Sequence, residues 1–290
     1  MHLTGDSRGL TVQATCKLNL FLEIVGKRPD GFHELESVFH ELDFGDELTF
    51  ERAPELSLVV KGDGAPPGEE NLVLKAARLF ASEIKTSAGA RITLTKRVPS
   101  GAGLGGGSAD AAATLLALDR LWNLATPRAM LHSLAARLGS DVNFFLEGGT
   151  ALCTGRGEIV TPLPAHPPLH FALLAPPFPT LTADVYRRFT FDLNAPRRSS
   201  NILISRLPAG TPAALEGGLL NRLEPAALAA EPRLVRVLAT AQRIGPSGAR
   251  VTGSGSTVFM PVSSRAEAEK LASDPELSLL GRVIPASSAR

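Results

Sequence analysis

Residues 99–110 read Pro-Ser-Gly-Ala-Gly-Leu-Gly-Gly-Gly-Ser-Ala-Asp, and five of the seven residues in 101–107 are glycine. The residues that follow, 111–118, are alanine, leucine and one threonine, a composition that favours a helix. We therefore expect a glycine loop that enters a helix, with Ser108 or Asp110 near the helix cap. A helix N-terminus presents unpaired N–H groups and the positive end of the helix dipole. The stretch therefore predicts a phosphate-binding loop.

Two familiar nucleotide loops fit this stretch poorly. A P-loop ends in Gly-Lys-Ser/Thr, and no lysine follows these glycines. Gly101, Gly103 and Gly106 match the spacing of the dinucleotide fingerprint, but that fingerprint needs a strand directly before it and a second strand after its helix. Here residues 96–100 intervene before the loop, and a second helix follows the first. A flexible linker is the plain alternative, yet a linker would not run into an alanine-leucine helix.

The composition is that of a globular protein with a balanced charge. The 290 residues include 30 basic and 29 acidic side chains, which argues against general affinity for nucleic acid or a membrane surface. Cys16 and Cys153 make neither a disulfide framework nor a metal site, and the sequence shows no signal segment or long apolar run. We expect an α+β protein in the cytoplasm, with no nucleic-acid or membrane partner. A proline-rich stretch predicts a boundary between domains 1–162 and 163–290.

Residues 11–25 alternate between apolar and polar side chains, as in a half-buried strand. Lys17 and Asn19 lie on its polar face. From this strand alone we expect both to face solvent.

The remaining pattern predicts a mixed chain of strands and helices. Pro29-Asp30-Gly31 is a turn, and Gly45-Asp46 predicts a second turn between strands at 32–44 and 47–51. Asn71 is expected to cap a helix through about residue 83. Asp141 follows a helix stop at Gly139 and is either a cap or a working group. The other expected elements are strands at 56–61, 90–95, 170–174 and 281–284, a hairpin at 148–161, and helices at 108–124, 127–138, 183–189, 219–223, 233–242 and 265–272. Residues 251–259 are expected to form a hairpin or a strand-to-turn corner, where a plain tight turn and a ligand contact are equally supported.

Three segments together resemble the motifs of the GHMP small-molecule kinase superfamily. They are Ala14-x-x-Lys17-Leu18-Asn19-Leu20, the glycine stretch 99–108, and Val251-Thr252-Gly253-Ser254-Gly255-Ser256. The resemblance implies a ribosomal-protein-S5-like N-terminal domain and a ferredoxin-like C-terminal domain. Segments 28–33 and 138–142 narrow it to a branch that phosphorylates the tertiary hydroxyl of a sugar alcohol linked to cytidine diphosphate, in non-mevalonate isoprenoid synthesis.

The resemblance also implies the roles of individual residues. Lys17 and Asp141 match the catalytic pair, although a simple salt bridge remains the plain reading of these two. ATP is the co-substrate, and Mg²⁺ is expected mainly through its phosphates, with the metal ligands unknown. Substrate-binding positions are Asn19, Phe32, His33, Thr182 and Tyr186. ATP-binding positions are Asn71, Leu72, Lys96, Pro99, Gly101, Ala102, Gly103, Leu104, Gly105, Gly106, Gly107 and Ser108.

Two departures and several other functions stay open at this point. Ala109 replaces a serine that is frequent in the superfamily, and Phe32 replaces a commoner tyrosine. A sibling kinase for mevalonate, homoserine or galactose would lack the Phe32-His33 base site. A diphosphomevalonate decarboxylase, a nucleotide-binding module without turnover and, least favoured, a dinucleotide oxidoreductase are the remaining alternatives.

Overall fold

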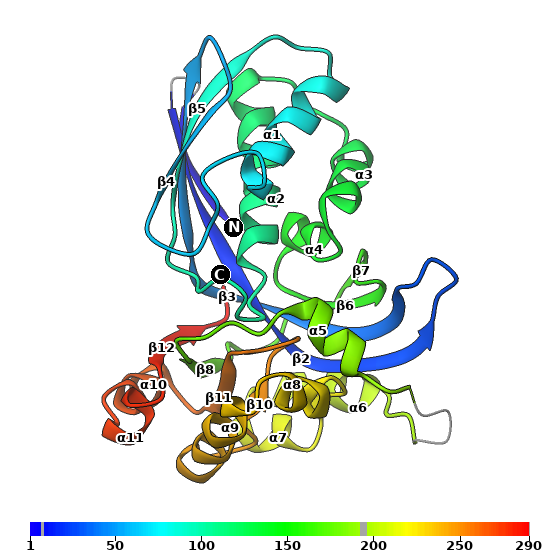
Figure 1. The fold of residues 1–290 in the computed structure, drawn as a ribbon, viewed down its shortest axis with the longest axis vertical. Coiled ribbons are helices and arrows are strands. Elements are labelled where there is room, and N and C mark those ends of the chain that lie inside the picture. The colour runs from blue at the N-terminus through cyan, green and yellow to red at the C-terminus, as the bar shows by residue number, and fades with distance from the viewer. Residues whose placement is uncertain (7–8, 192–195, 290) are drawn as a thin grey trace. The chain divides into compact units, whose positions relative to one another are not determined.

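The computed structural model describes residues 1–6, 9–191 and 196–289. They form two compact units that interleave along the chain (Figure 1). Unit 1 comprises 1–16, 44–100 and 105–148, and unit 2 comprises 17–43, 101–104 and 149–290. The long strands β2 (Gly9–Lys27) and β3 (His33–Ala53) contribute residues to both units. The predicted boundary at 162/163 stays a prediction.

Unit 1 is a sheet with helices. Its strands follow the order β1-β2-β3-β5-β4. The elements that lie wholly in unit 1 are β1 (His2–Asp6), β4 (Ser57–Lys61), β5 (Gly89–Thr95), α1 (Leu72–Glu83), α2 (Gly106–Trp122), α3 (Arg128–Leu138) and α4 (Val142–Glu147).

Helix α2 is the centre of unit 1, where it packs against α1, α3 and α4 (Figure 1). Its alanines at 109, 111, 112, 113 and 117 are all completely buried. The small side chains of these buried alanines allow the neighbouring helices to approach closely. The alanine-rich sequence after the glycine loop therefore holds the first turn of α2 in a tightly packed setting.

Unit 2 contains two groups of strands. In the first, β9 pairs with β2, and β3 pairs with β6, which pairs with β7; the second is an antiparallel sheet in the order β10-β11-β8-β12. The strands are β6 (Thr150–Gly155), β7 (Ile159–Pro162), β8 (His170–Ala175), β9 (Leu220–Asn221), β10 (Arg250–Val251), β11 (Val258–Val262) and β12 (Arg282–Ser287). The helices are α5 (Thr182–Arg188), α6 (Asn201–Ile204), the 3₁₀ helix η1 (Leu207–Ala209), α7 (Pro212–Glu216), α8 (Glu224–Ala230), α9 (Arg233–Ile244), α10 (Arg265–Ala272) and α11 (Pro275–Ser278).

The antiparallel sheet of unit 2 is covered by helices. Helix α9 packs on β11, and α10 packs on β8 and β12. Leu234, Val237, Leu238 and Ala241 repeat at helical spacing on α9 and are buried against this sheet. The observed mixture of strands and helices confirms the predicted α+β class.

Several local predictions are confirmed. The Asn71 side chain accepts a hydrogen bond from the N–H of Val73 and caps α1, and α3 ends at Gly139. The predicted hairpin at 148–161 is present as β6 and β7, and the hairpin at 251–259 as β10 and β11.

Other local predictions are wrong. Gly45-Asp46 is not a turn, because β3 runs through it: a Cβ at Gly45 would lie 2.2 Å from the Ala14 carbonyl oxygen, so this glycine serves the close approach of two strands. Neither Ser108 nor Asp110 caps α2; the cap position is Gly105, in a left-handed conformation. The predicted helix at 219–223 is the short strand β9, where pairing with β2 overrides local propensity.

The solvent-facing reading of Lys17 and Asn19 is also wrong. The two residues are 4% and 2% exposed, because both faces of β2 are covered in this region.

Candidate active site

Lys17 and Asn19 form a buried polar pair on β2, within unit 2. The Lys17 ammonium donates a hydrogen bond to Asn19 Oδ1 at 2.6 Å and lies 4.7 Å from the centre of the Phe39 ring. Asn19 is itself fixed, since its amide nitrogen donates to the Ser37 hydroxyl at 3.0 Å and its backbone N–H donates to the Thr252 hydroxyl at 3.0 Å. A buried ammonium held in this way is a fixed positive charge, suited to a ligand anion.

The first half of the glycine loop, residues 101–104, packs in unit 2 beside this pair. The N–H of Lys17 donates to the carbonyl of Leu104 at 3.0 Å, and the N–H of Thr257 donates to the carbonyl of Ala102 at 3.1 Å. A Cβ at Gly103 would lie 2.2 Å from the Thr252 carbonyl oxygen. The second glycine cluster, residues 252–257, therefore supports the loop.

The same cluster lies against the lysine. A Cβ at Gly253 would be 3.1 Å from Asn19 Oδ1 and 3.6 Å from Lys17 Nζ. Asn221 fixes its backbone by donating to the carbonyls of Val251 and Gly253, both at 2.8 Å. The three motif segments are thus in direct contact within unit 2.

Unit 1 holds the second half of the loop. Gly105 caps α2, and Gly106, Gly107 and Ser108 make its first turn. A Cβ at Gly107 would lie 3.4 Å from Leu72 Cδ1, so the helix that Asn71 caps begins beside this turn. The first-turn N–H groups of α2 are the ones that a helix cannot satisfy internally.

Asp141 lies in the N-cap position of α4, also in unit 1. Its side chain makes no capping hydrogen bond within the described residues, so the cap reading is not supported. A Cβ at Gly139 would lie 3.9 Å from the Ser108 hydroxyl, which places the chain just before Asp141 beside the start of α2. Because Lys17 belongs to unit 2, the meeting of Lys17 and Asp141 is a proposal.

Lys96 lies in unit 1 between Asp46 and Asp110, and its side chain is 4% exposed. Pro99, at the start of the glycine loop, was also predicted to bind ATP and is partly buried.

The residues predicted to hold the cytidine group gather in unit 2. His33 stacks on Tyr186 with ring centres 5.2 Å apart, and its edge meets Phe189 at 5.7 Å. Burial, helped by the nearby Lys27 charge, lowers the pKa of His33. Thr182 begins α5 and shares a hydrogen bond of 2.9 Å with the Ser254 hydroxyl. Phe32 is 51% exposed, so its ring is accessible to a ligand.

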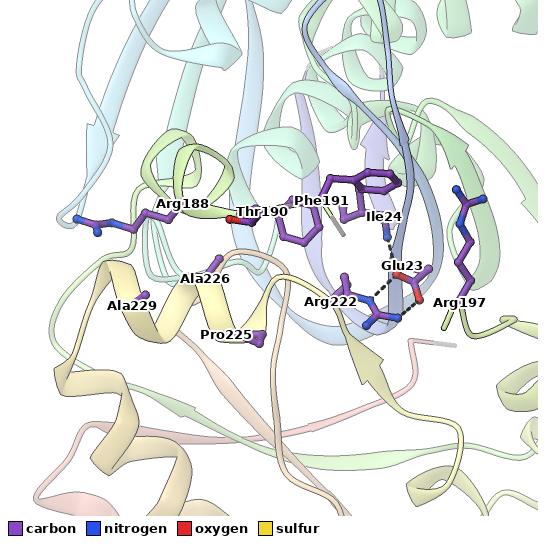
Figure 2. A pocket seen from close by; sticks show the side chains of 11 residues that line it. Glu23, Ile24, Arg188, Thr190, Phe191, Arg197, Arg222, Pro225, Ala226 and Ala229 are labelled. Atoms are coloured by element: carbon purple, nitrogen blue, oxygen red, sulfur yellow. Dashed lines mark hydrogen bonds and ion pairs between the residues drawn. The ribbon is translucent and has the colours of Figure 1, made fainter. Parts of the chain in front are cut away.

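A cavity of about 340 Å³ lies next to these rings in unit 2. Phe189, which contacts His33, is part of its wall, together with Phe191, Ile24 and residues of α8. Figure 2 shows Glu23 and Arg222 facing one another at this cavity, joined by two hydrogen bonds of 2.6 Å. This ion pair therefore forms part of the cavity wall.

Comparison with known proteins supports the kinase family that the three motifs indicate. Residues 71–149 match the family model of the GHMP kinases N terminal domain, and residues 205–275 match that of the GHMP kinases C terminal region. The 4-diphosphocytidyl-2-C-methyl-D-erythritol kinase of Pelotomaculum thermopropionicum is 44% identical over 252 residues, which are 86% of this chain and 88% of that protein. The kinase of the same description from Salinispora arenicola is 40% identical over 99% of this chain and 93% of its own length. This chain belongs to the 4-diphosphocytidyl-2-C-methyl-D-erythritol kinase family.

Solved structures give the same result. A crystal structure of 4-(cytidine 5'-diphospho)-2C-methyl-D-erythritol kinase matches with a TM-score of 0.82 and 34% identity, covering 97% of this chain and 100% of that one. A homoserine kinase from Cytophaga hutchinsonii, with a TM-score of 0.74 and 18% identity over 100% of this chain and 97% of its own, shares the fold. The chain is therefore a small-molecule kinase with the two-domain GHMP fold, and the fold predicted from its motifs is confirmed.

Several residues that contact the candidate site residues of each unit were missed from the sequence. Asn221 lies where the resemblance is weakest, and its neighbours carry no motif. Asp46 was read as part of a turn. Thr252 and Ser254 were within a recognised motif, which was the available signal, but neither was assigned a role.

Proposed function

We propose that this kinase transfers the γ-phosphoryl group of ATP to the tertiary (2-) hydroxyl of 4-diphosphocytidyl-2-C-methyl-D-erythritol, a step of non-mevalonate isoprenoid precursor synthesis. ATP is the proposed phosphoryl donor because the chain matches the GHMP kinases, which use ATP as co-substrate. The family relation to kinases described by this acceptor supports the choice of acceptor.

One geometric observation carries the phosphoryl-transfer chemistry. The buried Lys17–Asn19 pair touches both the loop residue Leu104 and the glycine cluster at 252–257. A Cβ at Gly253 would lie 3.6 Å from Lys17 Nζ and 3.4 Å from the Gly103 carbonyl oxygen, so the ammonium lies near the backbone of both glycine segments. Phosphoryl transfer requires mainly positioning and neutralisation of phosphate charge, and this arrangement supplies both.

Asp141 is the proposed base. A carboxylate at an element end that is not used as a helix cap can accept the proton of the acceptor hydroxyl as the phosphoryl group transfers. Lys17 would orient this carboxylate and offset charge at the acceptor oxygen. Asn19 would aim the ammonium through its hydrogen bond of 2.6 Å.

The remaining predicted residues divide between the two substrates. The first-turn amides of α2 and loop residues 101–104 would hold the triphosphate, with Asn71 and Leu72 beside the adenine. Phe32, His33, Tyr186 and Thr182 would hold the cytidine part. Polar contacts at the edge of the base discriminate between bases better than apolar ones.

Magnesium would arrive with ATP. Within the described residues no cluster of three or more His, Cys, Asp or Glu side chains could hold a metal ion. The residues present fit a metal bound mainly by phosphate oxygens, where it would neutralise triphosphate charge. Ala109 is completely buried, so a hydroxyl at that position would point into the interior of unit 1.

We further propose a cytoplasmic location without nucleic-acid or membrane partners. The balanced charge of the sequence supports this. Both cysteines are buried and are not joined by a disulfide, as expected in a reducing compartment. Within the described residues, none of the helices has the length and apolar character needed to cross a membrane.

Product identification tests the function. The purified chain is given ATP, Mg²⁺ and a panel containing the cytidylylated alcohol, mevalonate, homoserine and galactose, and products are located by phosphorus and carbon NMR. We expect phosphate only on the tertiary hydroxyl of the cytidylylated alcohol. Phosphorylation of another alcohol, release of CO₂ from diphosphomevalonate, or binding without turnover would each contradict the proposal.

A further inference from the structure

A buried group of three charges lies in unit 1 at the base of the glycine loop. The Lys96 ammonium bonds to one carboxylate oxygen of Asp46, and to Asp110 Oδ2 at 2.9 Å. The three side chains are 4%, 0% and 3% exposed. Enclosed charges of this kind persist only when neighbouring groups compensate them, so their geometry is fixed.

The three residues join the two stems of the loop. Lys96 follows the last residue of β5, Thr95, and precedes the loop that begins at Pro99. Asp110 lies one turn into α2, the helix that the loop enters. Asp46, on β3, also accepts hydrogen bonds from the N–H groups of Arg97 and Val98, at 2.6 and 2.9 Å. The lysine therefore ties the entering stem to the leaving stem.

Gly106 extends this arrangement to the first turn of α2. A Cβ there would lie 3.3 Å from Asp46 Oδ2 and 3.0 Å from Val98 Cγ1. The carboxylate that holds Lys96 is therefore packed directly against the turn that presents the phosphate-facing amides. Any displacement of the charged group would move those amides.

The ammonium itself is not presented to a ligand. Both of its acid partners are inside unit 1, and its side chain is almost wholly enclosed. We propose that the Lys96 side chain is a positioning group that clamps the two stems of the glycine loop, and that its ammonium does not contact the adenine base. This inference rests on the proposed role of the loop as the ATP cradle.

A clamp has a physical purpose in this loop. Glycines give the loop backbone conformational freedom, and ordering the loop when triphosphate binds would cost conformational entropy. A loop that is already held in its binding conformation avoids that cost. The clamp fixes the α2 amides before ATP arrives. The clamp would affect binding of the triphosphate equally for every nucleotide base, whereas a direct contact with adenine would favour ATP over other nucleotides.

Donor kinetics separate the two roles. In Lys96→Met, kcat/KM is measured with ATP and with GTP as donors at a saturating acceptor concentration. We expect both values to fall by the same factor, about ten- to a hundredfold, because displacing a catalytic cradle by about 1 Å has effects of that size. The ratio of the ATP value to the GTP value should be preserved, and the KM for the acceptor should not change.

Three outcomes would overturn the clamp. If only the ATP value falls, so that the ratio approaches one, Lys96 reads the base. If neither value falls, it has no role in donor binding. If acceptor KM rises as much as donor KM, the damage is general. Lys270→Met, on α10 of unit 2, is the matched control and should behave as wild type. Wild-type protein that transfers phosphate from no donor would instead refute the proposed function.

Asp110→Asn provides a second variant that should fold. Two carboxylates share one ammonium, and within the described residues Asp110 Oδ1 has no hydrogen-bond partner. Burial raises the pKa of Asp110, the Lys96 charge lowers it, and the Asp46 charge raises it. Together they shift the pKa of Asp110 from 3.8 to about 7. Burial alone would lower the pKa of Lys96, but Asp110 and Asp46 raise it. The amide relieves the excess negative charge and leaves Lys96 paired with Asp46.

This variant has two expected results. Donor kcat/KM should fall by a smaller factor than in Lys96→Met, again equally for ATP and GTP. Because the folded carboxyl has the higher pKa, the wild type is stabilised below pH 3.8 and loses that stability as the pH rises through about 7. The Tm of Asp110→Asn relative to wild type should therefore increase over this range. A loss of donor kcat/KM that differs between ATP and GTP would refute the clamp.

Discussion

At the scale of single residues, the proposed chemistry requires Lys17 and Asp141 to work together. The structure fixes Lys17 through Asn19 and the Phe39 ring. If the ammonium also aims the Asp141 carboxylate, Asp141→Asn should lower kcat by about 10²–10⁴ and leave the KM values nearly unchanged, because general-base assistance has that magnitude. Steady-state kinetics and binding of both substrates check this.

Non-additivity tests whether the two residues form one unit. Lys17→Met should be as damaging as Asp141→Asn, and the double variant little worse than either. A double variant whose loss equals the product of the single losses would show independent roles. An Asp141→Asn enzyme with near-normal kcat would remove Asp141 as the base. Asn19→Ala should show a smaller loss in kcat, since it frees the ammonium without removing it.

The base-binding residues give a second prediction at this scale. Tyr186 has its ring stacked near His33, and stacking of an aromatic side chain on a base contributes about 1–3 kcal/mol. Tyr186→Ala should therefore raise KM for the cytidylylated acceptor strongly and KM for ATP very little. Tyr186→Phe keeps the ring and is the matched control, expected to resemble wild type. A larger effect on ATP than on the acceptor would place the ring on the adenine side.

At the scale of elements, the glycines of the loop have different purposes. Gly103 has φ +76°, and a side chain there would meet the Thr252 carbonyl at 2.2 Å. Gly107 has ordinary helical geometry and would make only van der Waals contact with Leu72 at 3.4 Å. Gly103 is thus required by the fold of unit 2, whereas Gly107 is replaceable as far as packing in unit 1 is concerned.

A pair of alanine variants exploits this difference. Gly103→Ala should lower Tm and weaken the binding of both substrates, because the Thr252 carbonyl that the new methyl group would meet cannot move aside. Gly107→Ala should keep the wild-type Tm and lower the affinity for ATP but not for the acceptor, since its methyl group would obstruct the approach of phosphate to the α2 amides. Thermal unfolding and calorimetric titration with ATP measure both. Normal ATP affinity in Gly107→Ala would refute the phosphate-cradle assignment of that turn.

At the scale of the whole molecule, a buried histidine in unit 2 is expected to make stability fall in acid. His40 shares hydrogen bonds of 2.7 Å with the Thr150 hydroxyl and 3.0 Å with the Ser288 hydroxyl near the C-terminus. Burial, together with the neighbouring His166, lowers the pKa of His40 to about 3. Protonation is therefore favoured in the unfolded chain, where histidine titrates near pH 6.5.

The sign of the effect follows from that difference. The stability due to neutral His40 is complete above about pH 6.5 and is lost as the pH falls toward 3, by about 1.4 kcal/mol for each pH unit. His40→Gln should destabilise the protein at pH 7.5, and this deficit should shrink at pH 5. Denaturant unfolding at several pH values measures it. A deficit that is independent of pH would show that His40 does not titrate in this way.

Local sequence was sufficient for the order and type of most elements and for the glycine loop that enters α2. Glycine followed by helix formers, an asparagine cap and a period of two are signals that depend on near neighbours along the chain. The three motifs also identified the kinase fold. These features could be predicted because backbone propensity and helix-end chemistry are local properties.

Only the tertiary structure decided which polar residues are buried and what they contact. Alternation shows that β2 has two faces but not that both are covered, so Lys17 and Asn19 were expected in solvent. Gly45-Asp46 has a turn composition, yet the approach of β2 and the amides of Arg97 and Val98 make it a strand with a buried acid. Asn221 and the Lys96 clamp likewise depend on residues far away in sequence. Burial and charge pairing are set by neighbours in space, which the pattern along the chain does not encode.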